Sequence, residues 1–265
     1  MQGLVVQTLS ARPDYPFSVY PQTIYGQYTD LLREPSGVMP GYIGTHSPEG
    51  YFSHYRELNE IGRKCGTDKS DQVHNYLNKY EFFLHPWKDK SFTMLELGVF
   101  DGESVRMWRD YFQHAKIVGV DIDERCLGEQ GERIEIVIGD LSLEETLDSL
   151  KPYAPDIIID DASHIWSHQI KSLYTLFPVL PHGGIFILED LETSFPIFRY
   201  GNFDDSVISA YDFCSAVAKV VTGGEYLPEL QCSPSLSLLK PEVEAIASQI
   251  EMISFIKGSC ILVKK

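Results

Sequence analysis

The sequence predicts an α/β protein built on a mostly parallel, doubly wound sheet whose last two strands form an antiparallel hairpin. Two observations lead to this prediction. From Ser91 onward, short apolar runs alternate with helical stretches, and continuous apolar strands are typical of a parallel sheet covered on both faces. Near the C-terminus, residues 250–263 read as two strands joined at Lys257–Gly258. Together these patterns predict a seven-stranded sheet with helices on both faces.

The elements are expected in a simple order along the chain. Two helices precede the sheet, over 53–65 and 74–84; Gly66 closes the first and Pro86 stops the second. The parallel strands are expected at 92–97, 116–121, 134–138, 156–160 and 184–188. The helices that connect and follow these strands are expected near 103–113, 144–150, 165–177 and 205–221.

Length and pattern divide the chain into two parts. Residues 51–265 hold all of these elements and are expected to form one domain, for which a chain of 265 residues with 43% hydrophobic content suffices. Residues 1–50 carry many Tyr, Pro and Gly residues and little periodicity. Because its tyrosines give this segment apolar surface to bury, we expect an ordered N-terminal extension that acts as an oligomer arm or as a lid.

Composition excludes several classes of partner. A formal net charge of −16 argues against binding along a nucleic-acid phosphate backbone. No apolar run reaches membrane-spanning length, and the first residues lack the basic start and apolar core of a signal peptide. The five cysteines are scattered and odd in number, which favours a reducing compartment. We therefore expect a cytoplasmic protein with neither a membrane nor a nucleic acid as partner.

A glycine turn after the first strand is the strongest local signal for a nucleoside ligand. The apolar run that contains Glu96 breaks at Gly98, and Gly102 follows just before a helix. Such a turn lets the backbone approach a ligand closely and directs helix N–H groups at it. Asp121 ends the next strand, 23 positions after Gly98, which is about where an acid holds ribose hydroxyls in nucleotide-binding folds. Asp140, after the third strand, is expected near an adenine.

Acids also follow the fourth and fifth strands. Asp160 and Asp161 end one of these strands, and Glu189 and Asp190 end the other. Any one of them could be a helix cap, but so many carboxylates along one sheet edge would repel each other without a ligand or cation. Asp161, Glu189 and Asp190 offer only hard oxygen donors, which favours Mg²⁺ over zinc or copper.

His164 is the candidate proton acceptor. It lies three residues after Asp161, where the next helix is expected to begin with Ser163 as the N-cap. The positive end of a helix disfavours an imidazolium, so His164 would stay neutral and able to accept a proton. His168, one turn further on, is either a second metal or substrate contact or a plain helix residue, and the sequence leaves this open.

Several motifs of the chain occur in the same order in a known family. They are Gly66–Lys69 (GTDK), His74–Tyr76 (HNY), Leu95–Gly98 (LELG), Met107–Phe112 (MWRDYF), Asp160–His164 (DDASH), His168–Gln169 and Gly183–Asp190 (GGIFILED). Through them the chain resembles the macrolide deoxysugar O-methyltransferases of the demethylmacrocin and mycinamicin type, which are related to cephalosporin-hydroxylase-like proteins. The resemblance covers roughly residues 54–195 and implies the Rossmann-like fold of class I S-adenosylmethionine-dependent methyltransferases.

The resemblance also implies cofactors and residue roles. It points to S-adenosylmethionine and Mg²⁺, with Mn²⁺ as the alternative ion, and to methylation of a hydroxyl on a natural product, often on a sugar. By position, Asp161, Glu189 and Asp190 would be the metal ligands and His164 the general base. The residues expected at the cofactor are Thr67, Lys69, Glu96, Gly98, Asp121, Asp140 and Asp160.

Two departures from the family put the acceptor in doubt. The macrolide enzymes carry a sizeable extra N-terminal domain, whereas only about 50 residues precede the resemblance here, and Ala162 stands where Gly is usual. We expect a small-molecule acceptor bound by residues 1–50 and 191–235, and a homo-oligomer, either a dimer or a tetramer.

Two other functions compete with methyl transfer. One is a methyltransferase-fold protein with a non-methylating or accessory step in biosynthesis, which would not need an open metal site. The other is an NAD-binding oxidoreductase, but the spacing of Gly98 and Gly102 is not the G-x-G-x-x-G of dinucleotide-binding proteins.

Overall fold

The computed structural model describes residues 51–195, 206, 208–223 and 237–265. The expected extension, residues 1–50, lies outside these described residues, as does much of the segment 191–235 that was expected to bind the acceptor. No helix within the described ranges is long and apolar enough to cross a bilayer.

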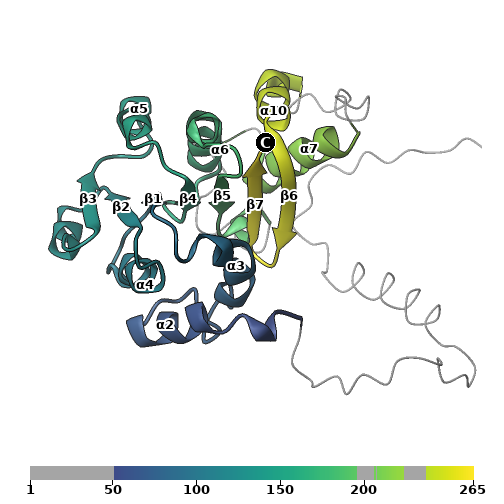
Figure 1. The fold of residues 1–265 in the computed structure, drawn as a ribbon. Coiled ribbons are helices and arrows are strands. Elements are labelled where there is room, and N and C mark those ends of the chain that lie inside the picture. The colour runs from purple at the N-terminus through teal and green to yellow at the C-terminus, as the bar shows by residue number, and fades with distance from the viewer. Residues whose placement is uncertain (1–50, 196–205, 207, 224–236) are drawn as a thin grey trace, which may run out of the picture. The chain divides into compact units, whose positions relative to one another are not determined.

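A seven-stranded sheet with the order β3-β2-β1-β4-β5-β7-β6 forms the centre of the fold (Figure 1). Its strands are β1 (Thr93–Leu97), β2 (Lys116–Asp121), β3 (Ile134–Ile138), β4 (Ile157–Asp160), β5 (Ile185–Leu188), β6 (Ile250–Ile256) and β7 (Ser259–Lys264). The first five strands pair in parallel, whereas β7 runs antiparallel to both β5 and β6. This architecture confirms the predicted sheet and hairpin.

Helices cover both faces of the sheet, as the sequence predicts (Figure 1). One face carries α2 (Glu57–Cys65), α3 (Leu77–Leu84) and α4 (Glu103–Tyr111). The other carries α5 (Glu144–Leu150), α6 (Trp166–Leu176), α7 (Ala210–Gly223) and α10 (Lys240–Ala247). Short 3₁₀ turns are η1 (Tyr51–His54), η2 (His85–Trp87), η3 (Glu124–Glu129), η4 (Lys151–Tyr153), η5 (Phe177–Val179) and η6 (Leu191–Ser194).

Alternation along the strands divides the core into two clusters. On β1, Leu95 and Leu97 are buried on the face covered by α5, α6, α7 and α10, whereas Met94 is buried on the opposite face. The strands are apolar on both sides because each side is covered. The reversal of strand order lies between β1 and β4, so the carboxyl ends of these two strands flank the crevice in which ligands of such sheets bind.

Several helices differ from the expected pattern. The helix expected over 53–65 begins at Glu57, after the 3₁₀ turn Tyr51–His54, and the helix expected from residue 205 begins at Ala210. The helix expected from residue 74 begins at Leu77, because the backbone N–H groups of residues 74–76 donate to carbonyls of residues 68–70 in the preceding turn. Helix α10 was not predicted, although Pro241 near its start and the buried Val243, Ile246 and Ala247 at helical spacing are signals that could have revealed it.

Candidate active site at the carboxyl ends of the strands

The turn after β1 brings the backbone of two strand ends into close contact. Gly98 adopts a left-handed backbone conformation with φ of 94°, and its N–H donates to the carbonyl of Val120 at 2.8 Å. A Cβ atom at this position would lie 2.2 Å from the backbone oxygen of Asp161, at the end of β4. A glycine is therefore required here for both its conformation and its lack of a side chain.

Replacing Gly98 with alanine is expected to destabilise the fold by two separable effects. The left-handed backbone costs roughly 1–2 kcal/mol for an L-residue, and overpacking against Asp161 adds about 1–3 kcal/mol. Gly183→Ala is the matched control, because Gly183 has φ of 75° but open space where its Cβ would be. Chemical denaturation should show a larger loss for Gly98→Ala; equal losses in the two variants would contradict the close approach.

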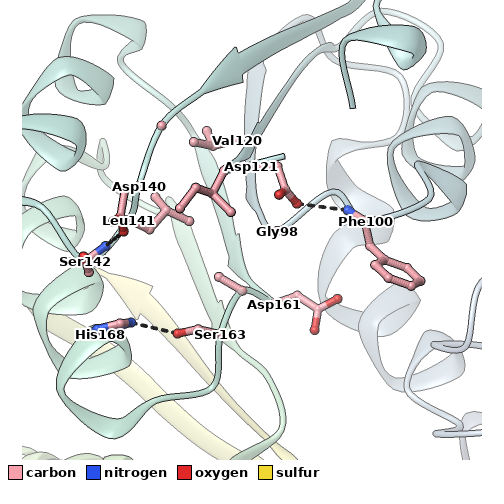
Figure 2. A pocket seen from close by; sticks show the side chains of 13 residues that line it. Gly98, Phe100, Val120, Asp121, Asp140, Leu141, Ser142, Asp161, Ser163 and His168 are labelled. Atoms are coloured by element: carbon pink, nitrogen blue, oxygen red, sulfur yellow. Dashed lines mark hydrogen bonds between the residues drawn. The ribbon is translucent and has the colours of Figure 1, made fainter. Parts of the chain in front are cut away.

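Asp121 holds the loop that follows Gly98. Its Oδ2 accepts a hydrogen bond from Phe100 N–H at 3.0 Å (Figure 2). The same oxygen accepts from Val99 N–H at 2.8 Å, and Oδ1 accepts from Asp123 N–H at 2.9 Å. Burial by itself would raise the pKa of this carboxyl, but the backbone donors outweigh it and lower the pKa below its ordinary value. Asp121 is therefore an ionised acceptor at the end of β2.

A cavity of about 410 Å³ opens beside Asp121 at this sheet edge (Figure 2). Gly98, Asp121 and Asp140, which the sequence predicts at the cofactor, all line it. The Oδ1 of Asp140 accepts a hydrogen bond from Ser142 N–H at 2.8 Å, and the Ser142 contacts lower the pKa of Asp140. The other lining residues are Phe100, Val120, Ile122, Gly139, Leu141, Ser142, Asp161, Ala162, Ser163 and His168.

Glu96 and Asp160 are buried and do not line this cavity. The Oε1 of Glu96 accepts a hydrogen bond from the Trp108 indole at 3.1 Å, and burial raises the pKa of Glu96 to about 7. Asp160 accepts a hydrogen bond from the Ser172 hydroxyl, and burial raises its pKa to about 6. Glu96 on β1 is thus bonded to helix α4, and Asp160 on β4 is bonded to helix α6.

A second cavity of about 320 Å³ adjoins the first. The two cavities share four lining residues: Gly98, Phe100, Asp161 and Ala162. The second cavity is also lined by Thr67, Lys69, His164 and Asp190. Of the residues predicted at the cofactor, Gly98, Asp121 and Asp140 line the first cavity, whereas Thr67 and Lys69 line the second. Of the predicted metal ligands, Asp161 and Asp190 line the second cavity.

Three side chains converge in the second cavity. Each of Asp161, His164 and Asp190 offers one potential ligand atom, and these atoms lie within 4.8 Å of one another. The Nε2 of His164 lies 3.3 Å from Asp190 Oδ2, an ion pair only when the imidazole is protonated. His164 and Asp190 both have left-handed backbones, with φ of 56° and 54°. Such conformations are costly outside glycine and gather at functional sites.

Glu189 is set back from this group and is bound to Lys69. The carboxylate of Glu189 is 1% exposed, and its Oε2 accepts a hydrogen bond from the Lys69 Nζ at 2.8 Å. The same ammonium contacts Asp161 Oδ2. Burial alone would lower the pKa of Lys69, but the two carboxylates raise it well above its ordinary value, so the lysine is charged.

The loop before α6 corrects the predicted helix start. The N-cap of α6 is Ile165 rather than Ser163, and it makes no side-chain capping bond. The Ser163 hydroxyl instead lies 2.9 Å from His168 Nδ1 (Figure 2). His168 therefore lies on the first cavity, beside Asp140 and Ser142, and not in the group around His164.

Two residues that the motifs contained without an assigned role also contact the site. The Tyr76 hydroxyl donates to Asp190 Oδ1 at 2.8 Å, and its ring stacks on His74 with centroids 5.2 Å apart. His74, Asp190 and Glu192 form another group whose potential ligand atoms lie within 4.8 Å of one another. The HNY motif was the signal for these residues in the sequence. Their contact with Asp190 depends on a turn that backbone hydrogen bonds hold, which no periodicity indicates.

Comparisons with known proteins fit this geometry. No protein-family model matches the chain. The chain is 35% identical over 178 residues to 8-demethyl-8-alpha-L-rhamnosyl tetracenomycin-C 2'-O-methyltransferase of Streptomyces olivaceus, covering 63% of the chain and 46% of that protein. It is 30% identical over 210 residues to mycinamicin VI 2''-O-methyltransferase of Micromonospora griseorubida, covering 76% of the chain and 46% of that protein.

A solved structure has the same fold. The MycE methyltransferase of the mycinamycin biosynthetic pathway, in complex with Mg and SAH, superimposes with a TM-score of 0.66 at 24% identity over 78% of the chain and 54% of that protein. The chain thus spans about half the length of the relatives it matches. These comparisons make the chain a homologue of the macrolide and tetracenomycin sugar O-methyltransferases, with the fold of the MycE methyltransferase.

Proposed function

We propose that the protein is an O-methyltransferase that uses S-adenosylmethionine and a divalent cation, Mg²⁺ or Mn²⁺, to methylate a hydroxyl of a natural-product sugar or polyketide. The observation that carries this proposal is the pair of adjoining cavities, one with an ionised acid at the end of β2 and the other with hard donors at the ends of β4 and β5. Methyl transfer requires a nucleoside cofactor and an activated hydroxyl side by side, and this arrangement provides a place for each.

The relatives support the substrate class. Two of them are named for methylating hydroxyls of a rhamnosyl tetracenomycin and of mycinamicin VI, and a third is demethylmacrocin O-methyltransferase of Streptomyces fradiae, 33% identical over 148 residues. The MycE methyltransferase has also been solved with Mg, SAH and mycinamycin VI together. We therefore propose a glycosylated small molecule as the acceptor of this protein, with residues 51–265 as its methyltransferase domain and 1–50 as an extension.

The first cavity suits the nucleoside part of the cofactor. Asp121 would accept hydrogen bonds from the ribose hydroxyls, because it is ionised and lines the cavity. Asp140 and Leu141 lie on the same wall, where an adenine would pack. Gly98 also lines this cavity, where its lack of a side chain lets the loop after β1 approach the backbone of Asp161. When bound, S-adenosylmethionine supplies a methyl group on a positively charged sulfur.

The second cavity suits a hard divalent cation. Asp161 and Asp190 present carboxylate oxygens to it, and Glu189 would complete the set of ligands. Among the described residues no hydrogen-bond partner reaches Glu189 Oε1, although this atom is buried. A buried carboxylate oxygen without a donor is costly unless a cation binds it. When bound, the cation lowers the pKa of a coordinated hydroxyl.

His164 would take the proton of the acceptor hydroxyl. Its imidazole lies on the wall of the second cavity, and its Nε2 lies on the side of Asp190. Its left-handed backbone, with φ of 56°, is a conformation of the kind that gathers at functional sites. Proton removal by a positioned base contributes about 10²–10⁴-fold to the rate of such reactions.

Replacing Asp121 with alanine is expected to weaken S-adenosylmethionine binding by about ten- to a hundredfold, or roughly 1.5–3 kcal/mol, because the ribose hydroxyls lose their acceptor. Titration calorimetry measures this, with NAD⁺ as the competing ligand and Asp123→Ala as the control variant. Asp123 is a neighbouring acid that pairs with Arg125 instead. Unchanged affinity in Asp121→Ala would place the ribose elsewhere, and tight binding of NAD⁺ alone would overturn the proposed function.

A further inference from the structure

Lys69 is a deeply buried cation at the site. It is 1% exposed, and its ammonium donates to Glu189 Oε2 at 2.8 Å and contacts Asp161 Oδ2 as well. Glu96, which is also buried, is a third acid nearby. A lysine is almost never buried to this extent unless it is paired, so the ammonium and the acids form one buried ionic group in which the lysine offsets part of the negative charge.

The backbone holds Lys69 in this place. Gly66 ends α2 in a left-handed conformation, with φ of 89°. The following turn is closed by hydrogen bonds from its own N–H groups, including Tyr76 N–H to the Lys69 carbonyl at 2.9 Å. These contacts hold the backbone of Lys69 in place, whereas its four-carbon side chain has several rotatable bonds. Lys69 lines the second cavity, so a displaced ammonium could move into that space.

We propose that the Lys69 ammonium is a built-in counter-ion that holds Asp161 and Glu189 while the cation site is empty, and that the divalent cation displaces it. This inference rests on the proposed function, in which those two acids are metal ligands. Lys69 binds one oxygen of each acid, so a cation that binds both acids comes close to the ammonium even where it uses their other oxygens. Two positive charges at one pair of carboxylates also repel each other strongly in a buried site.

Two properties follow from this competition. The protein keeps its acids paired without metal, so folding does not depend on the cation. Metal affinity is lower than the three carboxylates alone would give, because binding must first separate Lys69 from them. Lys69 is thus a positioning residue that sets the affinity of the site, and it need not touch the acceptor.

The first test measures Mg²⁺ binding by titration calorimetry in the wild-type protein and in Lys69→Met, which keeps the length of the side chain but removes the charge. We expect Lys69→Met to bind Mg²⁺ at least roughly tenfold more tightly and to melt at a lower temperature in EDTA, with Mg²⁺ restoring the melting temperature. Lys64→Met changes the net charge equally on the exposed face of α2 and should behave as wild type. Equal or weaker Mg²⁺ binding by Lys69→Met would overturn the inference.

The second test needs no variant at Lys69. Acetic anhydride labels exposed amines, and mass spectrometry reports the extent of labelling at each lysine. In the wild-type protein, Mg²⁺ is expected to raise the labelling of Lys69 severalfold, because the displaced ammonium leaves its buried position, while Lys64 serves as the reference. Labelling of Lys69 that Mg²⁺ leaves unchanged or lowers would contradict displacement.

A third variant separates this inference from the proposed function. Asp190→Asn removes a proposed ligand that does not contact Lys69. If the wild-type protein fails to bind Mg²⁺, or Asp190→Asn binds it as well as wild type, the proposed metal site itself is wrong. If Asp190→Asn loses binding but Lys69→Met binds as wild type, only the displacement of Lys69 is wrong.

Discussion

His164→Ala is expected to lower kcat by about 10²–10⁴-fold while leaving the fold and the affinity for S-adenosylmethionine unchanged. The imidazole lies in the second cavity with Asp161 and Asp190, where an acceptor hydroxyl would lose its proton. Neither the described hydrogen bonds of Asp121 nor those of Asp140 involve this side chain, so the cofactor cavity should be intact. Initial-rate kinetics together with calorimetry would measure the two effects separately.

The control for this variant is His182→Ala. His182 is exposed and precedes β5, at the opposite edge of the sheet from the site, so its removal tests the loss of a histidine alone. The His182 variant should keep wild-type kcat. A His164→Ala enzyme with wild-type kcat would exclude His164 as the base and leave proton removal to another group or to water.

Removing the divalent cation is expected to reduce turnover to near the background rate. An aliphatic hydroxyl is far too weak an acid to ionise at neutral pH without help, and a cation held by Asp161, Glu189 and Asp190 provides that help. Adjacent oxygens of the acceptor could also bind the cation, which would fix the geometry of attack. Activity in excess EDTA should therefore fall sharply, and Mg²⁺ should restore it.

Cofactor binding is the internal control for the removal of metal. The first cavity is lined by Asp121 and Asp140 and lies beside the metal ligands without using their carboxylates for the ribose. S-adenosylmethionine affinity in EDTA should therefore stay within a fewfold of its value with Mg²⁺. Full turnover in excess EDTA would show that the reaction does not need the cation. Loss of cofactor binding in EDTA would show that the two cavities do not act separately.

The sheet could be predicted because its signals are local. Each parallel strand is a short apolar run, and the Lys257–Gly258 turn lies between two such runs in the hairpin. The start of α3 could not be predicted, because it depends on backbone hydrogen bonds to residues 68–70 that no periodicity reveals. Helix ends respond to such contacts more than to propensity.

The candidate site was predictable in its residue types but not in their pairing. Acids at the ends of parallel strands must lie along one edge, which is why Asp121, Asp161 and Asp190 could be named from the sequence. Their partners come from elsewhere in the chain: Lys69 lies 120 positions from Glu189, and Tyr76 lies 114 positions from Asp190. Only the three-dimensional structure shows that Lys69 binds two of the proposed metal ligands.

Transfer of a labelled methyl group tests the central claim most directly. The protein would be incubated with Mg²⁺, S-adenosylmethionine carrying a deuterated methyl group, and a panel of rhamnosides, macrolide glycosides and phenols, and the products analysed by mass spectrometry. We predict that a glycoside gains one deuterated methyl group on a sugar hydroxyl, and that this product is absent with His164→Ala or EDTA. Tight binding of S-adenosylmethionine without a methylated product from any hydroxyl acceptor would contradict the account.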